Sequence, residues 1–434
     1  MYLYQEDDVV EGIIAFIICL IIGIPIAFSL GISSVIMLLG NNIPMIIIAQ
    51  RMFTGIDSFP FMAIPFFILA GELMNKCEIT SKLVKFSDLF VGHIRGGLSH
   101  INIVASMFFA GITGSAVADT SAIGSMLIPA MHEKGFDDDF SAAVTAASSV
   151  VGPIIPPSIP MVVFALLSGQ SVAALFLGGL LPGILLGIAL LVPSYLISVK
   201  KGYPRREEKI LFKYFIISCF QAIVPLMMPL IILGGILTGI FTATEASAIA
   251  VVYSLVIGFF VYRNLKVKDL YGIFVETAKT TGIVFLVIAS ANIFNWLLSV
   301  EQVPQLMASI LKAHVHSQIM FLMMLNIVLL FLGTFIEGTA AMIITVPLFL
   351  PIAIAYGVHP VMFGVITVLN LMIGLITPPV GLCLYVACGI AKISLEKISK
   401  AVIPFLIAEI ATLFIVTYWP FLTLGLPRIL GYIK

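Results

Sequence analysis

The chain has 434 residues, of which 61% are hydrophobic and only 10% are charged, and its 22 basic side chains are balanced by 22 acidic ones. This composition excludes an ordinary soluble domain, and the balanced charge gives no indication of a nucleic acid partner. Apolar stretches of about 20 residues, each long enough to cross a bilayer as a helix, recur along the chain. The sequence therefore predicts an all-α polytopic membrane protein.

The predicted spans, in chain order, are 9–29, 31–50, 57–75, 139–168, 172–199, 214–237, 240–262, 280–299, 359–391 and 401–425. The segment before the first span, MYLYQEDDVVEG, is acidic where a cleavable signal peptide is basic, so we expect this span to be retained. Two further apolar stretches, 98–131 and 318–356, carry glycines and polar residues at their centres rather than at their ends. They are predicted to be re-entrant helical hairpins that enter and leave by the same membrane face.

Positive charge predicts the orientation, because Lys and Arg accumulate in cytoplasmic loops. With the acidic N-terminus in the periplasm and both hairpins reversing, Lys134 and four basic loops, 76–95, 200–213, 263–279 and 392–400, lie in the cytoplasm. Together they hold 18 of the 22 basic residues. Counting either hairpin as a single span would invert every later loop and destroy this asymmetry, so the charge pattern favours the hairpins.

Helix-breaking residues occur twice in the chain with the same spacing. The first set, Gly111, Pro129, Gly152, Pro156 and Pro157, recurs 222 positions later as Gly333, Pro351, Gly374, Pro378 and Pro379. Paired Gly and Pro interruptions in a very apolar chain point to the central binding site of a transporter. We therefore predict a duplicated unit.

The two copies are predicted to have opposite orientations in the membrane. The first hairpin opens to the cytoplasm and precedes an outward-running broken helix, whereas the second opens to the periplasm and precedes an inward-running one. The predicted parts are N-terminal scaffold helices at 1–75, repeat 1 at 76–200, central scaffold helices at 201–279, repeat 2 at 280–400 and a C-terminal helix at 401–434. This is an inverted repeat with two re-entrant hairpins and two broken transmembrane helices.

The hairpin tips and the facing helix breaks are rich in oxygen ligands. The first tip reads GITGSAVADTS and its break GPIIPPS, in which Thr113, Ser115 and Ser158 offer hydroxyl oxygens. The second tip, GTFIEGT, faces GLITPP and has Glu337 where the first copy has Ser115. The pattern predicts an oxygen cage for a cation, more acidic in the second copy. The alternative is that these residues only permit kinks and close helix packing.

Single polar residues give weaker indications. Glu337 is a functional candidate because a carboxylate inside a membrane is costly, with protonation or a structural pair as the alternative. For Asp119, helix capping, an internal pair and ion binding remain open. Glu245 is predicted to stabilise a helix start, and Asn295 to form an interhelical hydrogen bond. The five cysteines have no metal-ligand or disulfide spacing and are predicted to be packing residues.

Motifs of enzymes are missing from the sequence. No phosphate-binding G-x-x-x-x-G-K-[ST] loop, H-E-x-x-H or G-x-S-x-G pattern occurs. The chain is therefore predicted to be no enzyme and to need no organic cofactor, and transport driven by an ion gradient is the expected mechanism.

Four segments carry a resemblance to a known family: VVGPIIPPSIPMVVFALLSG at 150–169, FLGGLLPGILLG at 176–187, GGILTGIFTATEASAIAVVY at 234–253 and NLMIGLITPPVGLCLYVACGIAKIS at 370–394. They resemble the DctM-like large membrane (M) subunit of the tripartite ATP-independent periplasmic (TRAP) transporters, in the ion transporter superfamily. The resemblance implies an elevator-type transporter whose mobile domain contains both hairpins and both broken helices. It also implies Na⁺-coupled import of an organic acid, such as a C4-dicarboxylate or a sialic acid, across the bacterial inner membrane.

The resemblance further implies the site residues. Sodium, the coupling ion and the only metal expected, would be bound by Gly111, Thr113, Gly114, Ser115, Gly152, Pro156, Gly333, Thr334, Glu337, Gly338, Gly374, Thr377 and Pro378. The organic acid would contact Ser115, Pro157, Ser158 and Pro379.

The implied partners are a small membrane (Q) subunit and a soluble periplasmic substrate-binding (P) protein. Two alternative functions stay open on the sequence. One is a stand-alone sodium/dicarboxylate symporter or cation antiporter of similar architecture, and the other is a membrane assembly protein without a transport cycle.

Overall fold

The structure is a computed structural model, and it describes residues 6–77, 79–206 and 212–433. Within these ranges every regular element is a helix, and no strand occurs. Seven of the described helices are long and apolar enough to cross a membrane, or eight if the bent pair Ile46–Thr54 and Phe59–Lys76 forms one span. The prediction of an all-α membrane protein is confirmed.

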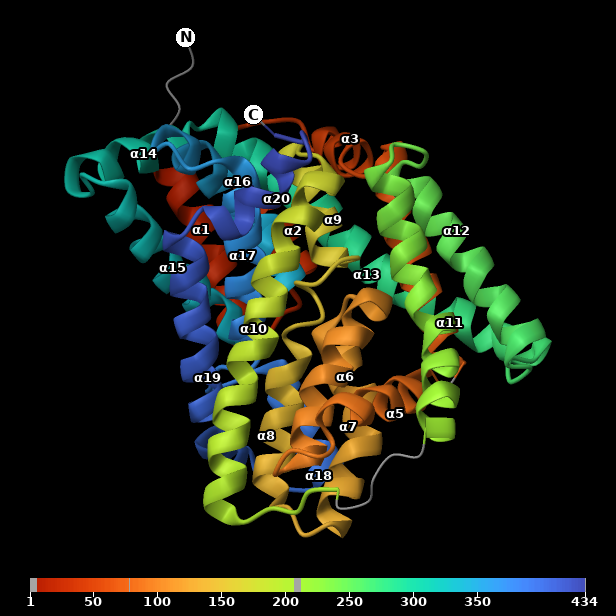
Figure 1. Cartoon of the computed structure of the whole chain (residues 1–434). Coiled ribbons are helices and arrows are strands. Elements are labelled where there is room, and N and C mark those ends of the chain that lie inside the picture. Colours follow the sequence, from red (N-terminus) through yellow and green to blue (C-terminus); the bar gives the residue numbers. More distant parts are fainter. Residues whose placement is uncertain (1–5, 78, 207–211, 434) are drawn as a thin grey trace.

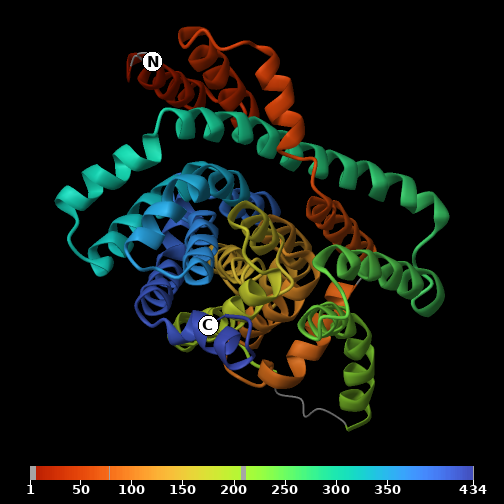
Figure 2. The same ribbon diagram turned by 90° about the horizontal axis from the view of Figure 1, so that it is seen from above.

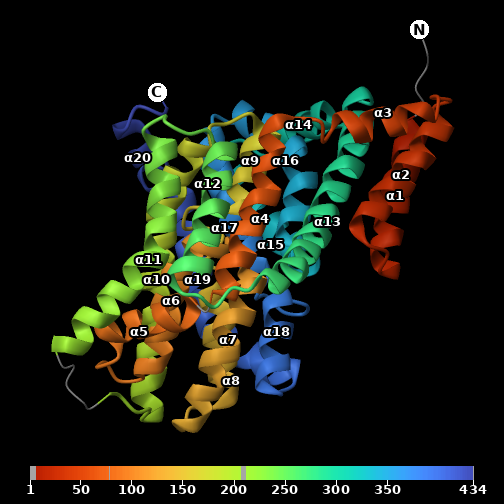
Figure 3. The ribbon, with the colours of Figure 1, turned by 90° about the vertical axis from the view of Figure 1, so that its right-hand side faces the viewer.

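The N-terminal helices form a separate pair at one edge of the molecule (Figure 3). They are α1 (Glu6–Ile22) and α2 (Ile26–Gly40), followed by the short α3 (Ile46–Thr54), and α2 packs on α13 (Val267–Val300). The predicted boundary near residue 30 is wrong. The first helix ends at Ile22, because Gly23 adopts a left-handed conformation (φ +87°) and Pro25 has no amide hydrogen to continue the helix.

The duplicated unit is visible in the order of the helices. The first copy runs through α4 (Ala63–Lys76), α5 (Ile79–Val91), α6 (Gly97–Thr113), α7 (Ala116–Glu133), α8 (Asp138–Ser149), α9 (Ile159–Ser168) and α10 (Val172–Lys201). The second copy runs through the end of α13, then α14 (Val303–His314), α15 (Gln318–Phe335), α16 (Gly338–Ala355), α17 (Pro360–Gly374), α18 (Leu382–Ala391) and α19 (Leu395–Tyr418). Each helix from α14 to α19 begins within a few residues of 222 positions after its counterpart in the first copy.

The two copies have opposite orientations, as predicted. In Figures 1 and 3, α5 and the start of α8 lie at one end of the molecule, whereas α14 and α16 reach the other end, where α3 and α20 (Phe421–Ile429) also lie. Helices α6 and α7 form the first hairpin, and α15 and α16 form the second. Both predicted hairpins and both predicted broken helices, α8–α9 and α17–α18, are confirmed.

The remaining helices surround the repeats. Helices α11 (Phe212–Leu237) and α12 (Ala243–Val256) pack against each other, and α12 lies along α4. A capping box starts α12, in which the Glu245 carboxylate accepts a hydrogen bond from the Thr242 amide at 2.8 Å. The helix-start role predicted for Glu245 is confirmed.

Helix α13 is longer than the sequence predicted. It begins at Val267 rather than near residue 280, because its first turns are amphipathic and carry charges such as the Glu276–Lys279 ion pair. Figure 2 shows it as a long rod along one side of the bundle, between the N-terminal pair and the repeats. Asn295 of this helix donates a hydrogen bond to the Ile343 carbonyl of α16 at 3.3 Å, as predicted.

The core of the bundle is formed by the first halves of the two broken helices. Residues 140–149 of α8 and 361–374 of α17 are buried around their whole circumference. Helices that are apolar or small on every side belong in the centre of a membrane bundle. The two breaks at the ends of these helices therefore lie inside the protein, where irregular backbone is tolerated in a membrane.

Candidate substrate and cation site

The first hairpin tip is a tight reversal built on glycine. Helix α6 ends at Thr113, Gly114 adopts a left-handed conformation (φ +60°), and Ser115 caps α7 by accepting a hydrogen bond from the Ala118 amide at 3.4 Å. A methyl group added at Gly114 would lie 3.0 Å from the amide nitrogen of Ile159. Only glycine therefore combines this backbone conformation with such a close approach to the broken helix.

The first break forms a pocket wall opposite that tip. The chain is irregular after α8 until Ser158, which caps α9 by accepting a hydrogen bond from the Met161 amide at 3.2 Å. The Ser158 hydroxyl donates to the Pro153 carbonyl at 2.5 Å, and the Pro156–Pro157 peptide bond is cis. In this conformation the buried Ser158 hydroxyl therefore organises the break itself.

The second hairpin tip has the same construction with a different cap. Helix α15 ends at Phe335, and Glu337 caps α16 by accepting a hydrogen bond from the Ala340 amide at 3.0 Å. Glu337 thus occupies the structural position of Ser115, as the sequence alignment of the two copies predicted. Its side chain is exposed on the surface of the chain rather than enclosed.

The second break makes a closer contact with its tip than the first. A methyl group added at Gly374 would lie 2.4 Å from the carbonyl carbon of Gly333. The Gly381 amide approaches the Thr334 carbonyl at 3.5 Å, and Thr377 donates its hydroxyl proton to the Ile373 carbonyl at 2.9 Å. As in the first copy, a cis Pro–Pro bond, Pro378–Pro379, lies within the break.

The structure thus brings most of the predicted residues together in two groups. In the first copy, methyl groups added at Gly111 and Gly114 would lie 3.3 Å from the Pro156 carbonyl and 3.4 Å from the Pro157 carbonyl, respectively. In the second copy, Gly333 and Thr334 lie against Gly374 and Gly381. For Thr113, the last residue of α6, the structure describes the backbone but not the side chain.

Gly152 has a different neighbour from the one predicted. A methyl group added there would lie 2.2 Å from a carboxylate oxygen of Asp119, which comes from the middle of the first hairpin and is fully buried. Asp119 therefore does not lie at the surface near the headgroups, and the three roles left open for it are those of a buried group. The carboxylate lies in the interior, beside the first break.

Buried polar networks attach each hairpin to its broken helix. In the first copy, Asn102 of α6 donates to the Thr145 hydroxyl at 2.6 Å and accepts from the Ser148 hydroxyl at 2.9 Å. In the second copy, the Asn370 amide donates to the Asn326 side-chain oxygen of α15 at 2.9 Å. Ser148 and Asn370 are equivalent positions of the two copies. The sequence analysis missed both networks, and the only signal was an amide side chain within each apolar segment.

The first tip also contacts helices outside the hairpins. A cavity of about 10 Å³ lies among Ile112, Pro157 and Ile159 of the first copy, Phe67 and Ala70 of α4, and Met228 and Ile232 of α11. This volume is enough for about one water molecule. The first tip is therefore closed against α4 and α11 in this conformation, across an apolar contact.

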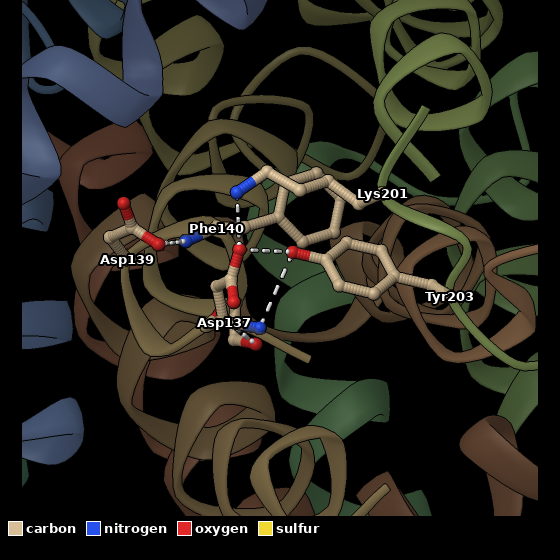
Figure 4. A network of polar contacts seen from close by, with 6 residues as sticks. Asp137, Asp139, Phe140, Lys201 and Tyr203 are labelled. Atoms are coloured by element: carbon tan, nitrogen blue, oxygen red, sulfur yellow. Dashed lines mark hydrogen bonds and ion pairs between the residues drawn. The ribbon is translucent and has the colours of Figure 1, made fainter. Parts of the chain in front are cut away.

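At the opposite end of α8, a polar network joins that helix to α10 (Figure 4). The Asp137 carboxylate, which precedes α8, accepts hydrogen bonds from Lys201 at 2.6 Å and from the Tyr203 hydroxyl at 2.8 Å. These two donors lower the pKa of Asp137 below its ordinary value. Burial and the bond to Asp137 raise the pKa of Tyr203.

These features define a class of protein. Two inverted units, in which a hairpin tip meets a broken helix inside the bundle, are the architecture of secondary transporters with a central site. The family model of the tripartite ATP-independent periplasmic transporter, DctM component, matches residues 13–422, and the chain belongs to this family. Members of the family form one component of a tripartite transport system.

Characterised relatives support this assignment. The chain is 40% identical over 428 residues to the sialic acid TRAP transporter large permease protein SiaM of Vibrio cholerae, covering 98% of this chain and 99% of the relative. It is 37% identical to the C4-dicarboxylate TRAP transporter large permease protein DctM of Rhodobacter capsulatus, covering 94% and 96%. It is 42% identical to the isethionate TRAP transporter permease protein DctMQ of Oleidesulfovibrio alaskensis, covering 93% of this chain and 64% of the relative.

The fold is also similar to a solved structure. The YdaH transporter of Alcanivorax borkumensis, described as having an unusual topology, superposes with a TM-score of 0.65 over 86% of this chain and 87% of that chain. The sequence identity is 12%, so the similarity concerns the fold alone.

Proposed function

We propose that this chain is the permease subunit of a sodium-coupled, binding-protein-dependent importer of an organic acid. The observation that carries the proposal is the meeting of each hairpin tip with a helix break, twice and in opposite orientations. Relatives named for sialic acid, C4-dicarboxylate and isethionate share an anionic organic substrate class. An anionic organic substrate is therefore the class that the relatives favour for this chain as well.

Sodium would bind where backbone carbonyls and side-chain oxygens converge at the two tips. In the first copy these groups are the backbone of 111–115 with the break after Gly152, and in the second copy they are Thr334, Glu337 and Thr377 with the backbone of Gly333 and Gly374. Oxygen ligands suit a hard cation such as Na⁺. The carboxylate of Glu337 would give the second site the stronger field.

The organic acid would bind between the copies, near Ser115, Pro157, Ser158 and Pro379. Ser115 and Ser158 each precede the first turn of a helix, where free amide groups and the helix dipole favour an anion. A carboxylate or sulfonate fits this arrangement because it carries the negative charge that a helix N-terminus attracts.

An elevator motion fits the distribution of contacts. The networks through Asn102 and Asn370 hold each hairpin and broken helix together, whereas the contact of the first tip with α4 and α11 is made by apolar side chains. A body that is rigid inside and bounded by apolar surfaces can slide as a unit.

The partners would be a small membrane subunit and a periplasmic binding protein. The chain itself would lie in the bacterial inner membrane, with its N-terminus in the periplasm.

Uptake by the reconstituted system tests this proposal. The full chain would be placed in proteoliposomes with and without candidate partner proteins, with labelled sialic acid, succinate and isethionate as probes. We expect uptake of one probe that requires an inward sodium gradient and both partners. Uptake without partners would favour a stand-alone symporter, and uptake that ignores sodium would contradict the coupling.

Variants of the tips separate transport from a purely structural role. Ser115→Ala, Ser158→Ala and Glu337→Ala are each expected to lower sodium-dependent uptake severely at normal expression. Ser125→Ala is the matched control. Ser125 lies on α7, the helix that Ser115 caps, but it is exposed, and its hydroxyl donates to the Ala122 carbonyl of the preceding turn. Full uptake by all three tip variants would support an assembly protein whose breaks are packing features.

A further inference from the structure

A carboxylate that the site does not use lies in the middle of α19. The Glu409 side chain is 0% exposed, and both of its carboxylate oxygens lack a hydrogen-bond partner among the described residues. Its counterpart in the first copy, 222 positions earlier on α10, is Gly187. The carboxyl group at this position therefore belongs to one copy only and is not part of the backbone design that both copies share.

Among the described residues, the helices packed most closely against α19 are α8, α10, α17 and α18, and none of them has a basic residue away from its ends. Their charged or titratable groups near the membrane surfaces, including those of α19 itself, are Asp137, Asp138, Asp139, Tyr195, Lys200, Lys201, His359, Lys392, Glu396, Lys397, Lys400 and Tyr418. Lys400, the nearest along α19, is nine residues away, or about 14 Å. On α18 the titratable groups are Cys383, Tyr385 and Cys388.

Glu409 lies on a helix that packs against the second half of the second broken helix, because α19 contacts α18. Cys383, at the start of α18, is buried. Cys383 directly follows the break, and its amide donates to the Leu375 carbonyl at 3.0 Å. A charge on Glu409 therefore acts on the region proposed to hold sodium.

An ionised carboxylate without hydrogen bonds or a nearby cation is strongly disfavoured in such an interior. A metal ion would need several ligands, and no group of three or more His, Cys, Asp or Glu side chains suited to a metal occurs in the described part of the chain. A proton needs a single carboxylate oxygen. Protonation is thus the state of Glu409 that its surroundings favour.

We propose that Glu409 is a proton-binding site in the body that carries the second hairpin, and that its proton opposes cation binding at the second break. The proton is held while the cation site is empty and leaves to water when a cation binds, because the ionised carboxylate attracts the cation. The second half of this proposal rests on the proposed sodium coupling. The first half does not.

Infrared spectroscopy of the full-length chain in lipid nanodiscs tests the proton directly. At neutral pH we expect the carbonyl band of a protonated carboxylic acid, which is lost in Glu409→Gln and retained in Glu396→Gln. Glu396 is the matched control, since it lies on the same helix but is exposed and paired with Lys400. Glu409→Gln has the shape of the protonated acid and is expected to fold, which a single symmetric elution peak checks. Identical spectra of the native chain and Glu409→Gln would overturn the proposal.

Sodium titration of thermal stability tests the coupling. For the native chain, the apparent sodium affinity is expected to rise about tenfold from acidic to alkaline pH. In Glu409→Gln it should stay at the low value at every pH, whereas Glu396→Gln should follow the native chain. An unchanged pH dependence in Glu409→Gln would overturn the linkage. A native chain that shows the infrared band but no sodium response would leave the proton site standing and contradict the sodium coupling instead.

Discussion

The two copies of the repeat share a backbone design but differ in where their charges lie. Both have a capped hairpin tip, a cis Pro–Pro bond in the break and a polar network between hairpin and half-helix. The first copy has its interior carboxylate on the hairpin, at Asp119, where the second has Ala341. The second has carboxylates at Glu337 and Glu409, where the first has Ser115 and Gly187.

This difference indicates which features the geometry requires and which belong to the chemistry. The glycines and prolines are kept in both copies because the close approach of tip and break depends on them. If the proposed cation sites are correct, the acids can differ because a binding site needs an electrostatic field of a particular strength and not a particular backbone. The two sites are therefore expected to be similar in shape and unequal in their affinity for a cation.

The largest expected effect is at the contact between tip and break. Gly374→Ala would place a methyl group 2.4 Å from the backbone of Gly333, whereas Gly152→Ala would meet the end of the Asp119 side chain. Backbone cannot move aside as a side chain can, so we expect a loss of about 3 kcal/mol or more for Gly374→Ala and about 1–2 kcal/mol for Gly152→Ala. Thermal unfolding in detergent measures both.

Gly282→Ala is the control for this comparison, because nothing lies within 4 Å of a methyl group added there on α13. It should be neutral or slightly stabilising. A larger loss of stability in Gly152→Ala than in Gly374→Ala would show that the closer backbone contact of the second copy does not determine the cost of the added methyl group.

A smaller effect is expected in the networks. Asn370→Ala removes the donor to the Asn326 side-chain oxygen and a second donor to the Asn326 carbonyl, and about 2–3 kcal/mol of stability should be lost. Ser148→Ala, at the equivalent position, removes one donor to Asn102 and should lose about 1–2 kcal/mol. Chemical unfolding of each variant against Ser125→Ala gives the two values. Equal losses would contradict the expectation that the two hydrogen bonds from Asn370 to Asn326 contribute more than the single one from Ser148 to Asn102.

Much of this architecture could be predicted from the sequence, and the reasons are local. Gly111 lies two residues before the end of α6 and Gly152 lies in the break after α8, so the clusters of Gly and Pro marked the tips and breaks without tertiary information. The basic loops predicted opposite directions for the two copies. The contact of Gly152 with Asp119 was not predictable, since it depends on how two distant segments pack. The start of α13 was missed because its first turns are amphipathic, and a search for apolar runs ends at charged residues. Glu409 was visible as an acid within an apolar span, but its isolation is a property of the packing alone.

The unequal charges of the tips can be tested by making the second tip resemble the first. Glu337→Ser keeps a side chain that can cap α16, so stability should change by no more than about 0.5 kcal/mol. The loss of the carboxylate should weaken the apparent sodium affinity of uptake about tenfold, or about 1.4 kcal/mol. Sodium dependence of uptake in proteoliposomes measures the change. A variant that keeps the native sodium dependence would show that this carboxylate is no cation ligand.

The smallest effects are expected at the caps of the two central half-helices, where Asp137 of the first copy corresponds to His359 of the second. Burial and the positive charge of Arg428 lower the pKa of His359, and the hydrogen bond from Lys201, with that from Tyr203, lowers the pKa of Asp137.

Since both folded-state pKa values are depressed, the contribution of each group to stability is complete above its unfolded pKa and is lost as pH falls through its folded pKa. The step from His359 should begin below about pH 6.5 and that from Asp137 below about pH 3.9. Asp137 is 46% exposed, so screening limits its step to less than about 1 kcal/mol. His359→Asn keeps a side chain that can cap α17, and Asp137→Asn removes no cap because the Asp137 side chain makes no cap hydrogen bond. Each variant should remove only its own step from a plot of stability against pH. A step that persists in its own variant would mean that another group produces it, and the two caps would then be equivalent in structure alone.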